Sequence, residues 1–233
     1  ILLGMPASKK RFFSLGVFLL SGYVLILTYS RGAMVGTASG VFALAVVAKK
    51  IRLRAILVLL LIIVLVGGVL YRYADRPELT RYDIRRIATD PDRFSAGRLG
   101  RAKQVITGFN ALPFSAKLFG LGFGGILTSP WGWKFEYVDN LYLSLLFKMG
   151  IVGMAFLFWV LLTLFWTLLR LRSQVTNVYY LGIINGGIAG LFASLVHNLA
   201  DTLWFFPPLS ANFWFLAGIT MAIALIGSQE TVQ

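Results

Sequence analysis

Six apolar runs dominate the sequence, and each is long enough to cross a lipid bilayer as a helix. A hydrocarbon core of about 30 Å requires roughly 17–25 helical residues. Of the 233 residues, 58% are hydrophobic and 13% are charged, which is far more apolar than a water-soluble domain. The runs are 12–29, 32–48, 55–71, 141–169, 179–197 and 209–227. The sequence therefore predicts an all-α, polytopic transmembrane protein with about six transmembrane helices.

The positions of the basic residues predict how these helices are oriented, because Lys and Arg in short loops stay on the cytoplasmic side. Basic clusters occur at 9–11, 49–54 and 170–172. An even number of spans then places both ends of the chain in the cytoplasm. We expect the chain to have three segments: transmembrane helices in 1–71, a long external loop in 72–140 and transmembrane helices in 141–233. The opening residues are typical of a loop that follows an earlier helix, so we expect a longer multi-pass protein.

Glycine spacing predicts close helix packing in the second run. Gly32, Gly36 and Gly40 recur every four residues, and small residues at this spacing let transmembrane helices approach each other closely.

The external loop has a pattern of its own. Residues 95–112 form a predicted amphipathic helix with Leu99, Val105, Ile106 and Phe109 as its apolar members, and we expect it to lie on the membrane surface. Residues 118–126 form a predicted glycine-rich turn. The loop carries eleven Lys and Arg against seven Asp and Glu, so an anionic partner at this face is expected.

Composition excludes several kinds of site. The absence of cysteine excludes thiolate catalysis and Cys-based metal sites, and a single histidine excludes a histidine cluster. A carboxylate site for Mg²⁺ or Ca²⁺ stays open, but we expect metal-independent chemistry and no cofactor. Nucleic acid is not an expected partner, because the basic residues accompany no binding motif. The GxGxxG match at 120–125 lacks the βαβ unit that a dinucleotide site needs.

The polar pair Asp139-Asn140 precedes the apolar run at 141–169. The pair lies where the external loop would re-enter the membrane, so its carboxylate is expected to face a cavity or an interface. Lys148 lies nine residues into the same run, about 13 Å along a helix at 1.5 Å per residue. We expect hydrocarbon around it, unless it lines a polar cavity or extends outward.

Several motifs occur in an order that resembles the O-antigen ligase and polymerase superfamily. They are Ser30-Arg31-Gly32, Ala96-Gly97-Arg98, Gly120-Leu-Gly122-Phe-Gly124, Asp139-Asn140-x9-Gly150-x2-Gly153 and His197-x3-Asp201 with Pro207-Pro208 and Phe213-Trp214. The resemblance implies a GT-C-type glycosyltransferase of the bacterial cytoplasmic membrane with its active face on the periplasmic side. Its substrates would be undecaprenyl-diphosphate-linked oligosaccharide and an acceptor glycan, lipid or protein. The ligases have histidine where this chain has Asp139, and many polymerase-like members have aspartate, which favours a polysaccharide polymerase.

The resemblance also suggests which residues carry the chemistry. Arg31 and Arg98 would neutralise the diphosphate leaving group, since guanidinium binds phosphate bidentately. The alternatives are a helix-end arginine that reaches the lipid headgroups and a solvated surface charge. Asp139 would accept the proton of the acceptor hydroxyl, or it would only cap the helix.

The remaining candidates would bind or orient the sugar. Asn140 would orient the site or a sugar, and Tyr142 would stack on a sugar ring or anchor at the membrane interface. His197 and Asp201 are four residues apart on one helix face and would hydrogen-bond to each other. A ligase or protein O-oligosaccharyltransferase remains an alternative to the polymerase, and so does a small-solute or anion transporter. A non-catalytic scaffold would leave the arginine, aspartate and histidine residues unexplained.

Overall fold

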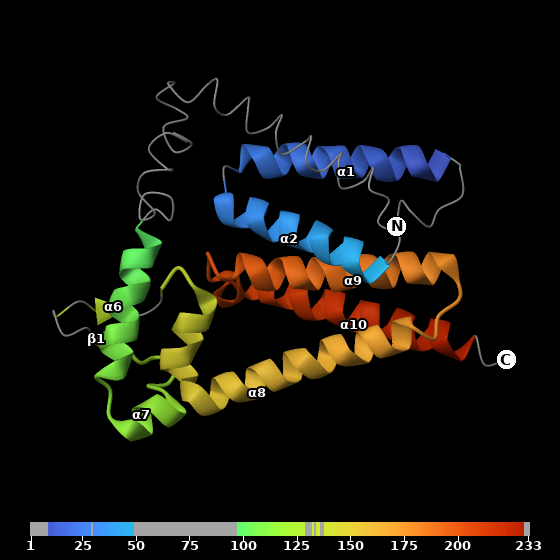
Figure 1. Cartoon of the computed structure of the whole chain (residues 1–233). Coiled ribbons are helices and arrows are strands. Elements are labelled where there is room, and N and C mark those ends of the chain that lie inside the picture. Colours follow the sequence, from blue (N-terminus) through green and yellow to red (C-terminus); the bar gives the residue numbers. More distant parts are fainter. Residues whose placement is uncertain are drawn as a thin grey trace.

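The protein is a helical bundle with a smaller helical segment at one end (Figure 1). The computed structural model describes residues 9–28, 30–48, 97–128, 132, 134–135 and 138–230. The long helices are α1 (Lys9–Leu27), α2 (Arg31–Ala48), α8 (Leu141–Arg172), α9 (Val178–His197) and α10 (Pro207–Gln229). The shorter elements are α6 (Arg98–Asn110), α7 (Phe114–Phe119), the paired strands β1 (Leu127–Thr128) and β2 (Lys134–Phe135), and the 3₁₀ turn η2 (Leu203–Phe205).

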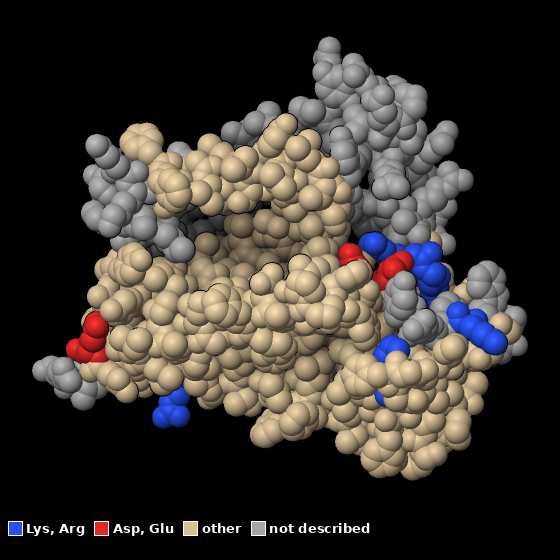
Figure 2. Space-filling model, turned by 180° about the vertical axis from the view of Figure 1, so that it is seen from behind, with Lys and Arg blue, Asp and Glu red and all other residues tan. Residues whose placement is uncertain are grey.

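Five of the six predicted apolar runs are helices in the structure, and the sixth, 55–71, lies outside the described residues. The helices α8, α9 and α10 are long and apolar enough to cross a membrane, while α1 and α2 contain shorter apolar stretches. In Figure 2, charged side chains lie toward the two ends of the body and the surface between them is uncharged. The prediction of an all-α, polytopic membrane protein is confirmed.

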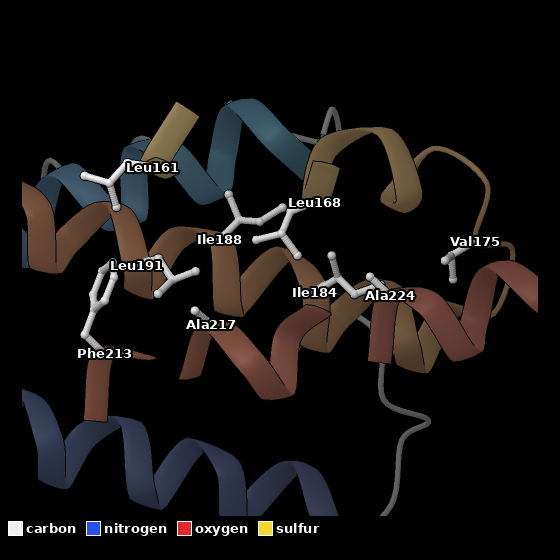
Figure 3. Packing of buried hydrophobic residues seen from close by; sticks show 9 residues of the cluster. All are labelled: Leu161, Leu168, Val175, Ile184, Ile188, Leu191, Phe213, Ala217 and Ala224. Atoms are coloured by element: carbon white, nitrogen blue, oxygen red, sulfur yellow. The ribbon is translucent and has the colours of Figure 1, made fainter. Parts of the chain in front are cut away.

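The largest hydrophobic core lies between α8, α9 and α10 (Figure 3). Its buried members are Leu161, Leu168, Val175, Ile184, Ile188, Leu191, Phe213, Ala217 and Ala224. Where α9 meets α10, a Cβ on Gly187 would overlap the side chain of Thr220, so the absence of a side chain permits this approach. This packing fixes the end of α9, which carries His197, relative to the second part of α8.

The predicted close packing of α2 is confirmed, and its partner is α9. A Cβ on Gly36 would lie 2.8 Å from the Ala193 carbonyl oxygen, and a Cβ on Gly40 would lie 2.8 Å from the Ala193 Cβ. A side chain at either position would force the two helices apart. The start of α2 is thereby held against the end of α9.

The helix α8 is broken at Gly150, which the sequence analysis did not anticipate. Gly150 has φ 69° and ψ −173°, so the backbone leaves the helical path and starts a second helix in a new direction. Figure 1 shows the short first part, 141–149, turned away from the long second part. Residues 151–172 alone are long enough to span a membrane, whereas 141–149 are too few to do so.

The glycine-rich turn stabilises this break. The backbone N–H groups of Leu121 and Gly122 donate to the carbonyl oxygens of Phe147 and Lys148, at 2.8 and 3.0 Å. These carbonyls end the first part of α8 and would otherwise lack partners. The approach needs glycine on both sides, because a Cβ on Gly120 would overlap the Lys148 carbonyl and one on Gly150 would overlap the Leu118 carbonyl.

The predicted amphipathic helix is present as α6, but its apolar residues differ in burial. Val105 and Phe109 are buried against Leu127, Val138 and Phe147, in a second core that joins α6 to the first part of α8. Leu99 and Ile106 are exposed, so only these two members are available for contact with lipid. The helix therefore packs onto the protein through one face instead of resting only on a membrane.

The break in α8 yields a test with a matched control. Gly150→Ala should lower the melting temperature of the purified full-length protein, because alanine is strained by about 1–3 kcal/mol at this combination of φ and ψ and its Cβ would meet the Leu118 carbonyl. Gly124→Ala is the control, since its Cβ would meet nothing within 4 Å and Gly124 does not have positive φ. Equal melting temperatures for both variants would contradict this account of the break.

Candidate functional site at the start of α8

Asn140, and not Asp139, caps the first turn of α8. The Asn140 side-chain oxygen accepts a hydrogen bond from the Leu143 N–H at 3.0 Å, which satisfies a free donor of the first turn. The Asn140 amide nitrogen donates to the Leu199 carbonyl oxygen at 2.8 Å. Both ends of the amide are therefore used in holding the helix start. The Asp139 carboxylate is left available for a different role.

Asp139 forms ion pairs with two arginines of α6. Its Oδ2 accepts a hydrogen bond from Arg101 Nη2 at 2.7 Å, and Arg98 Nε lies 3.9 Å from the same oxygen. The two arginines are three residues apart, so they project from one face of α6. Gly97 begins this helix with φ 75°, which glycine adopts without strain. The predicted arginine Arg98 is thus present at the site, but Arg101 makes the closer contact.

The segment that follows α9 is tied directly to the start of α8. The Leu141 N–H donates to the carbonyl oxygens of Asn198 and Asp201, both at 3.0 Å. Asn198 is fully buried, and its side chain accepts from the Leu203 N–H and donates to the Ser194 carbonyl oxygen. These bonds fix the position of the segment that carries His197 and Asp201.

His197 lies beside Asp201, but the two do not share a helix face as predicted, because α9 ends at His197, and they do not form a hydrogen bond. The distance from His197 Nε2 to Asp201 Oδ2 is 3.9 Å. His197 Nε2 is buried and has no hydrogen-bond partner among the described residues. Arg98 is close enough to interact electrostatically with the His197 ring. A buried ring nitrogen without a partner is costly, so this atom is suited to bind a ligand group.

Arg31 begins α2 at the same end of the bundle. Ser30 caps the helix, with its hydroxyl accepting from the Ala33 N–H at 3.2 Å. The next residue, Gly32, is in direct contact with His197, since a Cβ there would lie 3.0 Å from His197 Cδ2. The backbone of Arg31 is therefore close to His197, while its side chain lies outside the described part of the structure.

An open cavity of about 180 Å³ lies between α2, α9 and η2, next to His197. Its lining residues are mostly small, which follows from the close approach of α2 and α9. They are Ala33, Gly36, Thr37, Ala193, Ser194, His197 and Leu203. The cavity gives the imidazole of His197 access to a ligand.

Tyr142 is held by contacts within the protein. Its hydroxyl donates to the Leu195 carbonyl oxygen at 2.8 Å, and its ring stacks on Phe158 with centroids 5.9 Å apart. These contacts join the first part of α8 to α9 and to the second part of α8. They agree with a positioning role, while its predicted stacking on a sugar remains a prediction.

The surroundings of Lys148 differ from the sequence expectation. Lys148 precedes the break in α8, and it is 5% exposed within the protein instead of facing hydrocarbon. Its Nζ donates to the Phe123 carbonyl oxygen at 2.7 Å and lies 5.5 and 5.7 Å from the ring centroids of Phe147 and Phe205. Cation–π contacts of this kind stabilise a desolvated ammonium. Lys148 thus links the glycine-rich turn, α8 and η2.

These residues form one group at one end of the bundle, which we name the Asp139 cluster. Its members are Arg98, Arg101, Asp139, His197 and Asp201. Figure 2 shows acidic and basic side chains gathered at the end that carries α6. Of the three acidic residues in the described part of the chain, Asp139 and Asp201 belong to the cluster, while Glu230 follows α10 at the other end.

A comparison with protein families identifies the chain. A sequence model of the O-antigen ligase family matches residues 16–158, which is more than half of the chain. The chain belongs to the O-antigen ligase family. It is therefore a membrane enzyme of the O-antigen ligase and polymerase type. A search of curated proteins found no match.

The O-antigen ligase family match includes most of the cluster but not all of it. Arg31, Arg98, Arg101 and Asp139 lie within the matched residues, whereas His197 and Asp201 lie beyond them. The latter two are joined to the site by geometry alone, through the bonds to the Leu141 N–H and the contact with Gly32. No group of three His, Cys, Asp or Glu side chains in the described residues is arranged to hold a metal ion.

Arg101 was not predicted as a member of the site. Its spacing from Arg98 was a usable signal, because residues three apart on a helix share a face. The ion pair itself spans 38 residues of sequence, and no local pattern predicts such a contact.

The different roles of Asn140 and Asp139 can be tested by substituting each residue separately. Asn140→Ala should lower the stability of the purified full-length protein by about 1 kcal/mol, as measured by thermal melting, because the Leu143 N–H loses its partner. Asn140→Asp should restore only part of that stability, since a carboxylate also caps but cannot donate to the Leu199 carbonyl oxygen. Asp139→Asn should leave the helix start intact. If Asp139→Asn lowered stability as much as Asn140→Ala, Asp139 would be the structural residue.

Proposed function

We propose that the protein is a GT-C-type membrane glycosyltransferase that extends a polysaccharide from undecaprenyl-diphosphate-linked glycan. O-antigen or exopolysaccharide would be the product, and the reaction would need no metal ion. The observation that carries the proposal is the meeting of Arg98, Arg101, Asp139 and His197 at one end of a membrane bundle. Membership of the O-antigen ligase family supplies the class of substrate.

The arginines would bind the diphosphate of the lipid carrier. Breaking the bond between the sugar and the diphosphate leaves negative charge on the phosphate oxygens, and a guanidinium group stabilises that charge without losing its own proton. Arg98 is suited to this role, because its 3.9 Å contact with Asp139 is too long for a hydrogen bond and leaves its donors for a ligand. Arg31 would approach from the start of α2, beside His197.

Asp139 would act as the general base. Its carboxylate would accept the proton of the acceptor hydroxyl while that oxygen forms a bond to C1 of the donor sugar. The bond between C1 and the diphosphate oxygen breaks at the same centre, and its electron pair stays on undecaprenyl diphosphate. The proton on Asp139 then passes to water or to the released diphosphate.

The remaining candidate residues would position these groups or contact the sugars. Asn140 and Tyr142 hold the start of α8 through bonds to Leu199 and Leu195, and would thereby keep Asp139 in position. His197, which lines the cavity and has a buried ring nitrogen without a hydrogen-bond partner among the described residues, would contact a sugar hydroxyl. Asp201 would orient the His197 ring from 3.9 Å.

The charge distribution supports a location of the site on the outer face of the bacterial cytoplasmic membrane. Arg170 and Arg172 end α8 at the end of the bundle opposite the Asp139 cluster, and α1 begins on that same side with Lys9 and Lys10 (Figure 1). Basic residues at helix ends favour the cytoplasmic side. The cluster would then face the periplasm, together with α6 and α7 of the external segment 72–140.

A cellular assay tests the proposal. A strain that lacks the full-length gene would be complemented with the wild type, Arg31→Ala, Arg98→Ala or Asp139→Asn, and the chain lengths of its surface polysaccharide would be resolved on a gel. Long chains should return with the wild type only, since loss of one charge-stabilising donor slows such reactions on the order of 100-fold. Lys103→Gln is the matched control, because Lys103 is exposed on another face of α6.

Other outcomes of this assay would redirect the proposal. Glycan that accumulates on the lipid carrier with unchanged chain length would indicate a ligase or a protein O-oligosaccharyltransferase. A strain without any glycan defect would favour a transporter of small solutes or anions. Normal chain lengths with both arginine variants present in the membrane would remove the arginines from the reaction.

A further inference from the structure

We infer that Arg101 exchanges partners during the reaction, pairing with Asp139 in the free enzyme and with the lipid diphosphate when the donor is bound. This inference rests on the proposed function and extends it. It adds Arg101 to the substrate-binding residues, and it makes the freeing of the base dependent on the arrival of the donor.

The geometry of the Asp139 carboxylate supports the exchange. Oδ2 of Asp139 receives the short bond from Arg101 and also faces Arg98. The Arg101 guanidinium hydrogen-bonds to Oδ2 at 2.7 Å, so this oxygen is already engaged when a sugar hydroxyl arrives. Oδ2 would therefore take up the acceptor only after Arg101 has moved away.

The ion pair is also accessible to a competing anion. The side chains of Arg101 and Asp139 are 42% and 39% exposed. Exposed ion pairs contribute little to stability, because water competes for both partners. A diphosphate esterified by a sugar and a lipid carries more negative charge than one carboxylate and offers several acceptor oxygens. It is therefore a stronger partner for two arginines on one helix face than Asp139 alone.

The fold does not need the ion pair to hold α6 in place. Val105 and Phe109 on α6 are buried in the core that contains Val138 and Phe147. Val138 is the residue immediately before Asp139, so this core packs α6 next to the ion pair. Burial of these side chains supplies the docking energy that a half-exposed ion pair lacks. Arg101 can thus change partners while α6 stays where it is.

The exchange has a consequence for the order of events. An acceptor hydroxyl would meet an active base only after the lipid-linked donor has taken Arg101 from Asp139. The arriving diphosphate would then do two things at once: it would fix the leaving group and release the carboxylate.

A binding experiment on four proteins tests the exchange. The full-length wild type, Asp139→Asn, Arg101→Gln and the double variant would be reconstituted in nanodiscs, and the affinity for undecaprenyl diphosphate would be measured for each. Asp139→Asn should bind about two- to fivefold more tightly than the wild type, the range expected from loss of a competing exposed ion pair. Arg101→Gln should bind more weakly. In the Arg101→Gln background, Asp139→Asn should have little further effect.

The double variant separates exchange from general charge repulsion. Repulsion between Asp139 and the diphosphate would persist without Arg101, so equal tightening in both backgrounds would overturn the exchange. Unchanged or weaker binding by Asp139→Asn would overturn it as well. Lys103→Gln controls for the loss of one cation from α6, and melting temperatures with Arg101→Lys as a charge-preserving variant control for misfolding.

The same experiment distinguishes failure of the proposed function from failure of the partner exchange alone. Wild-type protein that fails to bind undecaprenyl diphosphate would contradict both the proposed function and the exchange. Wild-type binding that weakens with Arg98→Ala but shows no coupling between Arg101 and Asp139 would retain the diphosphate site and exclude the exchange.

Discussion

The backbone of α8 leaves the helical path at Gly150, and the position of Asp139 depends on that break. With φ at 69° and the carbonyl of Leu118 where a Cβ would be, only glycine fits. The break lets 151–172 cross the membrane while 141–149 turn aside at the end of the bundle. Asp139, just before that short part, consequently pairs with Arg101 of α6, while the nearby Leu141 N–H bonds to the Asp201 carbonyl oxygen in the segment after α9.

A second constraint brings α2 to the same place. Gly36 and Gly40 allow α2 to lie directly against Ala189 and Ala193 of α9, so its first residues reach His197. Small residues matter more for this contact than in a soluble protein, because lipid competes equally well for apolar side chains and close packing supplies much of the association energy. Two helix contacts, each dependent on glycine, thus unite residues that are distant in the sequence.

Periodicity and length predicted the helices, because a span of hydrocarbon imposes both on any sequence that crosses it. The four-residue spacing from Gly32 to Gly40 likewise predicted close packing. The break at Gly150 was not predicted, since the length of the run 141–169 indicated one continuous helix and the turn that stabilises the break lies some thirty residues earlier. For the same reason hydrocarbon was expected around Lys148, unless it lined a polar cavity or extended outward. The pairing of Asp139 with Arg101 depends on how α6 docks, and tertiary contacts of that kind have no local signature.

The proposed reaction requires the diphosphate of the lipid carrier to bind at the Asp139 cluster. An experimental structure of the full-length protein with bound undecaprenyl diphosphate tests it most directly. We expect phosphate density within hydrogen-bonding distance of Arg98 and Arg101, with His197 nearby. Phosphate density at the opposite end of the bundle, beside Arg170 and Arg172, would contradict it.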